Sequence, residues 1–172
     1  IEWSWNLLSE AERILMRQLS FFAGGWTLES AQAVCDGEVL VLINSLVKKS
    51  LIVVKQEAGS ETRYHFHEVV RQYAREKLIE AGEEENIRTR HLNYFLGHSE
   101  QAETALRGPA QAEWFARLEA ELDNIRAALE WADKINAVEA GLYIFGRLGR
   151  FWYRDLLEGQ RWAEKFIRKA ES

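Results

Sequence analysis

Two histidines and a glutamate lie close together in the stretch RYHFHE, residues 63–68. His65 and His67 are two positions apart, so in an extended strand both imidazoles lie on one face, and imidazole is a common zinc ligand. No third dependable ligand accompanies them, so the sequence predicts no metal site. An imidazole at the start of a helix can instead contact an anion, because the first backbone N–H groups of a helix lack partners within it and the helix dipole favours negative charge.

The apolar pattern around these histidines changes from that of a strand to that of a helix. Tyr64 and Phe66 are two positions apart, as on one face of a strand. The apolar residues that follow are three and four apart: Val69, Val70, Tyr73, Ala74 and Leu78. His67 is therefore predicted to lie at a strand-to-helix junction, where it either recognises a phosphate or serves as a helix cap.

The elements before this junction have the order of a winged helix. Ser9 and Glu12 form a capping box for a first helix, and Thr27 can cap a second helix over residues 28–34. A third helix is predicted over EVLVLINSLVKK, residues 38–49. The run LIVVK, the polar turn EAGSET and RYHFH then predict a two-stranded hairpin. Residues 1–81 are thus predicted to form a winged-helix domain of three helices, a β-hairpin and a helix.

The remainder of the chain, residues 82–172, is predicted to be an antiparallel α-helical array. Gly82 and the three glutamates after it indicate a hinge before the change of architecture. Residues spaced by three and four mark a helix through Leu92 and Leu106 and a second one through Phe115 and Leu129. The stretch GLYIFGRLGRFWY is apolar on most sides, which predicts a central helix, and the fold class is mainly α. Four tryptophans of this half are expected to pack between helices: Trp114, Trp131, Trp152 and Trp162.

The charge composition argues against a protein that binds nucleic acid or an anionic membrane mainly by charge. The 172 residues carry a net charge of −5, and residues 1–81 hold nine basic against eleven acidic residues. A protein that binds nucleic acid or an anionic membrane mainly by charge would show a basic excess. Cys35 is the only cysteine, so the chain can form no internal disulfide, and a cytoplasmic location is expected. The first residue is Ile1, and we expect the chain to be part of a longer protein.

No set of catalytic residues is complete in the sequence. A phosphate loop, a Gly-x-Ser-x-Gly elbow and a His-Glu-x-x-His pair are all missing from it. The chain itself is therefore expected not to be an enzyme, and no catalytic residue and no metal ligand is assigned.

Three stretches of the first half resemble a known segment: WSWNLLSEAERILMRQLSFFAGGWTLESAQAVC, VLINSLVKKSLI and YHFHEVVRQYAREKL. They resemble the winged helix that follows the nucleotide-binding core in STAND-class signalling ATPases, a group that includes NB-ARC proteins and many bacterial transcriptional regulators. The second half, through RLEAELDNIRAALEWA and RLGRFWYRDLLEGQRWAEKFI, looks like the start of the tetratricopeptide-like helical region of the same regulators. It shows no clean 34-residue repeat.

The resemblance implies a role for His67. In NB-ARC relatives a Met-His-Asp motif opens the helix after the wing, and its histidine contacts the β-phosphate of bound ADP. The matching residues are Phe66, His67 and Glu68, so histidine is retained while the other two positions differ. His67 is the implied nucleotide-phosphate contact in the intact protein, whose expected cofactor is ADP or ATP. No cofactor is expected in this chain alone.

Two functions follow from these patterns. The first is a non-catalytic regulatory and protein-interaction segment that couples the nucleotide state of an upstream core to a helical sensor or effector region, with further repeats or a protein as partner. The second is a DNA-binding winged-helix transcriptional regulator with an attached helical sensor. Groove recognition needs basic and amide side chains on the third helix, which offers Asn44, Lys48 and Lys49. The sequence therefore favours the first function, and neither DNA nor a membrane is the expected partner; the oligomeric state is left open.

Overall fold

The computed structural model describes residues 2–56 and 61–171, which belong to two compact units, Ile1–Arg90 and His91–Ser172. The sequence places the domain boundary between residues 81 and 82, at the turn between two helices. The units divide further along, inside the helix α6 (Glu84–Ala105). The first turns of α6 belong to the first unit, where Ile87 is buried and Arg90 forms an ion pair with Asp36.

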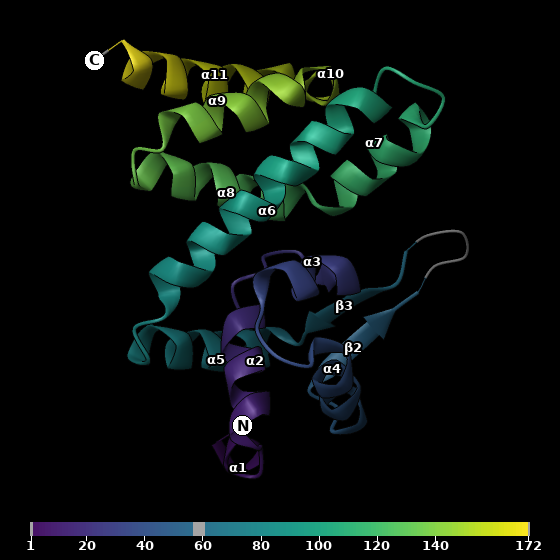
Figure 1. Cartoon of the computed structure of the whole chain (residues 1–172), viewed down its shortest axis with the longest axis vertical. Coiled ribbons are helices and arrows are strands. Elements are labelled where there is room, and N and C mark those ends of the chain that lie inside the picture. Colours follow the sequence, from purple (N-terminus) through teal and green to yellow (C-terminus); the bar gives the residue numbers. More distant parts are fainter. Residues whose placement is uncertain (1, 57–60, 172) are drawn as a thin grey trace. The chain divides into compact units, whose positions relative to one another are not determined.

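The first unit contains helices and a small sheet in the order that the sequence predicts, with one strand and one short helix added (Figure 1). Its elements before α6 are α1 (Glu2–Asn6), α2 (Glu10–Leu19), β1 (Trp26–Thr27), α3 (Leu28–Val34), α4 (Val39–Lys48), β2 (Ile52–Lys55), β3 (Arg63–Phe66) and α5 (Glu68–Glu80). Both predicted caps are present: Ser9 and Glu12 form a capping box on α2, and Thr27 and Ser30 form one on α3. The predicted EAGSET turn includes residues 57–60, which lie outside the described residues.

The sheet has three antiparallel strands in the order β1-β3-β2, instead of the two strands predicted. Strand β2 pairs with β3 so that Ile52 lies opposite Phe66, and β1 adds to the other edge with Trp26 opposite Tyr64. Gly25 allows this third strand because its φ is +80° and a Cβ there would lie 2.5 Å from the carbonyl oxygen of Tyr64. Only glycine brings the backbone this close to β3 without strain.

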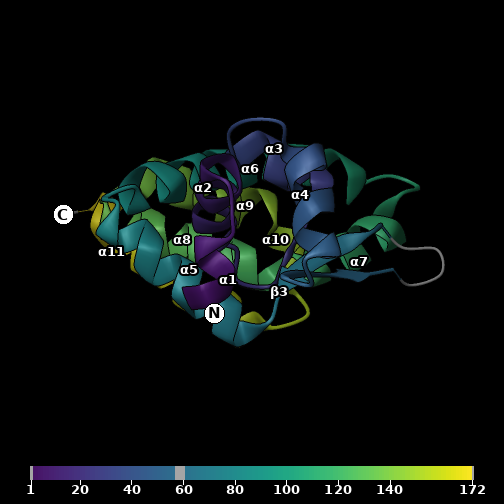
Figure 2. The same ribbon diagram turned by 90° about the horizontal axis from the view of Figure 1, so that it is seen from below.

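The core of the first unit lies where α2, α4 and α5 pack together beside the sheet (Figures 1 and 2). The helices contribute the apolar faces that their three-and-four spacing predicts. Among the fully buried side chains are Leu15, Leu19, Phe22, Trp26, Ile43, Leu46 and Leu78. This packing leaves the opposite face of α4 at the surface.

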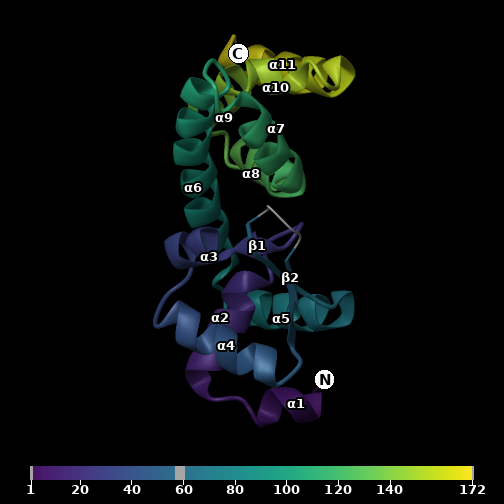
Figure 3. The ribbon, with the colours of Figure 1, turned by 90° about the vertical axis from the view of Figure 1, so that its right-hand side faces the viewer.

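The second unit is helical throughout its described residues. It contains the remainder of α6 and the helices α7 (Gln111–Ala120), α8 (Leu122–Lys134), α9 (Val138–Arg147), α10 (Gly149–Trp152) and α11 (Leu156–Ala170). The second half of α6 runs beside α7 and α8, and α9 packs against α11 (Figure 3). Trp131 and Trp152 are buried in its core, and Trp114 and Trp162 pack partly buried against it, so all four tryptophans join helices.

Two long helices predicted for this unit are each divided in the structure. The stretch from Phe115 to Leu129 breaks at Glu121, where α7 ends and α8 begins. The buried Glu121 carboxylate accepts a hydrogen bond from Nδ2 of Asn124 at 2.7 Å, which holds the turn. The predicted central helix over residues 141–153 breaks at Leu148, and it is not covered on all sides, because Tyr143 is 51% exposed. The described part of this unit is helical, as predicted, whereas an antiparallel, tetratricopeptide-like array stays a prediction.

Candidate functional site on α4 and the β2–β3 hairpin

The outer face of α4 presents a row of four exposed side chains. Val39, Ile43 and Leu46 are buried on the inner face of the helix. The exposed residues are spaced by three and four along the outer face: Leu40, Val41, Asn44 and Lys48. Lys48 forms no hydrogen bond or ion pair within residues 2–56 and 61–171. This face therefore combines one free cation and one amide with two apolar side chains.

The buried carboxylate of Glu12 fixes α4 against α2. It accepts hydrogen bonds from Oγ of Ser45 at 2.7 Å, from Nζ of Lys49 at 2.5 Å and from the backbone N of Ser9 at 2.8 Å. Burial alone would raise the pKa of Glu12, but these hydrogen bonds outweigh it and lower the pKa to about 2. Lys49, which the sequence offers for groove recognition, is thus held by Glu12 and oriented towards α2.

The hairpin β2–β3, the wing of this fold, adds further polar groups beside α4. Val54 and Lys55 are exposed at the end of β2, and Nη2 of Arg63 donates to the carbonyl oxygens of Gly24 and Gly25. His65 is half-buried on β3. Burial and the positive charges of Lys55, His67 and Arg63 lower its pKa, so the neutral imidazole is favoured.

His67 lies where the sequence predicts, between β3 and α5. It is exposed and occupies the N-cap position of α5 with extended backbone angles, φ −62° and ψ 144°, yet its side chain makes no capping hydrogen bond. Glu68 next to it is paired with Arg71 (Nη2 to Oε1, 2.8 Å) and accepts from Gln72 at 3.1 Å. The hydrogen bond from Arg71 lowers the pKa of Glu68. The imidazole of His67 is thus accessible to an anion, and no described contact assigns it one.

The described residues also bear on metal binding, on the reactivity of Cys35 and on membrane spanning. Within residues 2–56 and 61–171, no three His, Cys, Asp or Glu side chains gather closely enough to hold a metal ion. Cys35 is buried, and burial raises the pKa of its thiol, so the reactive thiolate is disfavoured. In the same part of the chain, every helix is too short or too polar to cross a bilayer.

Comparison with known proteins agrees with the geometry of the first unit. Residues 8–79 match the family model described as a winged helix-turn-helix domain, a span that runs from the residue before the Ser9 cap almost to the end of α5. Residues 8–79 form a winged helix-turn-helix domain. In this motif α3 and α4 are the paired helices, and α4 is the second of the two.

Curated relatives cover both units. The chain is 36% identical over 179 aligned positions to the Mycobacterium tuberculosis protein named "Putative HTH-type transcriptional regulator Rv0890c" and to the similarly named protein Mb0914c of Mycobacterium bovis. It is 39% identical over 101 positions to the Mycobacterium tuberculosis protein named "Uncharacterized protein Rv0894". The alignments cover 94% and 55% of this chain, and 20% and 25% of the relatives' lengths. The chain thus spans about a fifth of the regulators that it matches. No solved structure matches it.

These matches bear on the two functions that the sequence leaves open. They support the winged-helix part of the resemblance, and the relatives that align with most of this chain are named as HTH-type transcriptional regulators. They favour the DNA-binding alternative over the nucleotide-coupled module, whose STAND-type core and ADP contact stay predictions. The exposure of Leu40 and Val41 could not be predicted, because α4 is apolar on both sides and its pattern does not distinguish the buried face.

Proposed function

We propose that this chain is the DNA-binding and input segment of a transcriptional regulator. The observation that carries the proposal is the winged helix-turn-helix domain at residues 8–79, within an alignment to HTH-type regulators that covers 94% of the chain. In such domains the second helix of the motif lies in the major groove and its exposed side chains contact base edges. In this chain that helix is α4. The helical second unit would then receive the signal.

Each exposed side chain of α4 has a chemically matched base. Asparagine pairs with the N6 and N7 atoms of adenine, lysine donates to O6 and N7 of guanine, and apolar side chains contact the methyl group of thymine. Asn44 and Lys48 would therefore read adenine and guanine, while Leu40 and Val41 lie against thymine. Lys55 on the wing is placed for a phosphate. With only two or three cations contributing, the slope of log K against log salt would be about −2 to −3.

The test is selection from a random duplex library with the 172-residue chain, followed by anisotropy titrations. We expect enriched sequences that share thymine, adenine and guanine in a short element. Asn44→Ala should reduce the preference for adenine at its position by about 1–3 kcal/mol. Lys48→Glu should remove the preference for guanine at its position and also weaken binding overall, because it reverses a charge next to the DNA. Lys134→Glu on α8 is the matched control and should bind normally. Failure to enrich any sequence, or normal binding by Lys48→Glu, would exclude α4 as a groove reader.

A second candidate function is favoured by the exposed His67. Its uncapped position at the start of α5 suits contact with a phosphate on a nucleotide bound by an upstream core of the intact protein. In the full-length protein, His67→Ala should then weaken ADP binding by about 1–3 kcal/mol and raise basal output, while Gln72→Ala on the same helix should not. The 172-residue chain alone is not expected to bind ADP. Unchanged ADP affinity in a folded His67→Ala protein would show that His67 does not contact the nucleotide.

A further inference from the structure

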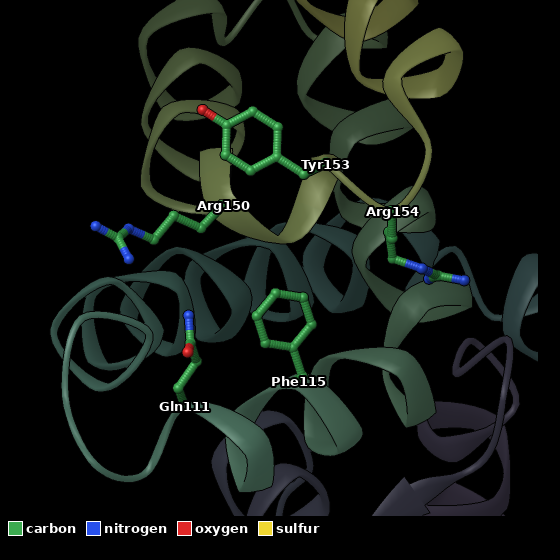
Figure 4. A pocket seen from close by; sticks show the side chains of 5 residues that line it. All are labelled: Gln111, Phe115, Arg150, Tyr153 and Arg154. Carbon is green, nitrogen blue, oxygen red and sulfur yellow. The ribbon is translucent and has the colours of Figure 1, made fainter.

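An open pocket of about 460 Å³ lies between α7 and α10 in the second unit. Phe115 and Gln111 of α7 face Arg150 and Tyr153 across it, and Arg154 closes one end (Figure 4). Phe115 is half-buried, and its ring lies 5.9 Å from that of Phe151 in the core, so it forms a fixed apolar floor. Tyr153 is 75% exposed at the rim. The pocket therefore has an aromatic interior and a polar edge.

The charges around this pocket favour an anion. Arg154 is paired with Glu119 at 3.3 Å and lies over the ring of Phe151. Arg150 is exposed and has no hydrogen-bond or ion-pair partner within residues 2–56 and 61–171. Asp155 forms no ion pair with Arg150 among the described residues; its Oδ1 instead accepts a hydrogen bond from the backbone N of Glu158 at the start of α11. A free guanidinium with its fork of donors is suited to a carboxylate.

We propose that this pocket binds an acidic peptide segment, with a carboxylate on Arg150 and a neighbouring apolar side chain on Phe115. A peptide fits better than a small molecule, because small-molecule pockets usually bury most of their ligand, whereas this one is open along a rim of exposed tyrosine and arginine. Both residue types are enriched at protein interfaces and among their energetic centres. None of the residues that line the pocket belongs to α4 or to the wing, so the proposal does not rest on DNA binding by α4.

The proposal is tested by panning a random-peptide phage library against the 172-residue chain. The recovered peptides should place Asp or Glu near Phe, Tyr, Trp or Leu. A labelled peptide of that kind should lose about tenfold or more in affinity when its acids become amides or when the chain carries Arg150→Glu. Tyr153→Ala should also weaken binding of the peptide, and because Tyr153 is exposed this change should leave the fold intact. Arg161→Glu, an exposed arginine of α11 outside the pocket, is the control and should bind normally.

Three results would overturn this assignment. The first is recovery of peptides with no acidic preference. The second is equal binding of the labelled peptide by wild type and Arg150→Glu. The third is that an oligo-dT strand competes with the labelled peptide for wild type but not for Arg150→Glu. Aromatic rings and arginine also stack on bases, so this result would make the pocket a site for single-stranded nucleic acid.

Discussion

At the scale of single residues, Glu12 has two roles: it caps α2, and it holds the candidate DNA-binding helix α4 against α2. Its capping role could be predicted from the Ser-x-x-Glu spacing, because both partners lie within one helical turn. Its second role could not, since Ser45 and Lys49 approach only after α4 has packed on α2. The same limit applies to His67, whose position at a helix start follows from the pattern, while any partner it has depends on the rest of the protein.

Replacing Glu12 by glutamine should therefore destabilise the chain and change how its stability depends on pH. The pKa of Glu12 is about 2 in the folded protein against 4.5 unfolded, so its ionic contribution is complete above about pH 4.5 and is lost as pH falls towards 2. We expect Glu12→Gln to cost about 1–3 kcal/mol at pH 7 and less at pH 3.5, measured by urea unfolding. Glu76→Gln, an exposed change on α5, should cost little at either pH. An equal cost for Glu12→Gln at both pH values would show that the carboxylate charge is not what stabilises the fold.

At the scale of elements, the contact between α9 and α11 depends on one glycine. A Cβ at Gly141 would lie 2.2 Å from the ring of the buried Phe166. Alanine normally favours a helix over glycine by about 1 kcal/mol, but here the clash must outweigh that gain. Gly141→Ala should therefore lower the free energy of unfolding by about 1–3 kcal/mol.

Gly146 in the same helix provides the matched comparison. No atom lies within 4 Å of a Cβ placed there, so Gly146→Ala should stabilise the chain by about 0.5–1 kcal/mol. Denaturant unfolding of both variants measures the difference. Equal effects at the two positions would mean that α9 and α11 are not packed as closely as described.

The elements also show why some of the fold could be predicted and some could not. Helices with caps or one-sided apolar faces, such as α2 and α3, follow from residues close in sequence. Strand β1 is only two residues long and exists because it pairs with β3, far along the chain. The break at Glu121 is hidden because the apolar spacing continues through it. On α4, apolar residues on both faces conceal which ones reach the surface, so the candidate site could be placed on the helix but its exposed row could not be identified.

At the scale of the whole chain, the boundary between the two units leads to a test with fragments. The sequence indicates a division after Ala81, yet the first turns of α6 are bound to the first unit. Ile87 is 2% exposed there, Arg17 pairs with Glu83 at 3.0 Å, and Arg90 pairs with Asp36 at 2.9 Å. A fragment that ends at residue 81 loses all three interactions, whereas one that ends at residue 90 keeps them.

We expect the fragment 1–90 to unfold cooperatively and to be more stable than 1–81 by about 2–4 kcal/mol. Burial of an isoleucine side chain is worth about 1.5–3 kcal/mol, and the partly exposed ion pairs add up to about 1 kcal/mol each. Circular dichroism during urea unfolding of both fragments gives the difference. The fragment 1–90 with Ile87→Ala is the internal control. Its free energy of unfolding should lie closer to that of 1–81 than to that of unmodified 1–90. If 1–81 proves as stable as 1–90, the start of α6 contributes nothing to the winged helix-turn-helix domain, and the boundary read from the sequence is the correct one.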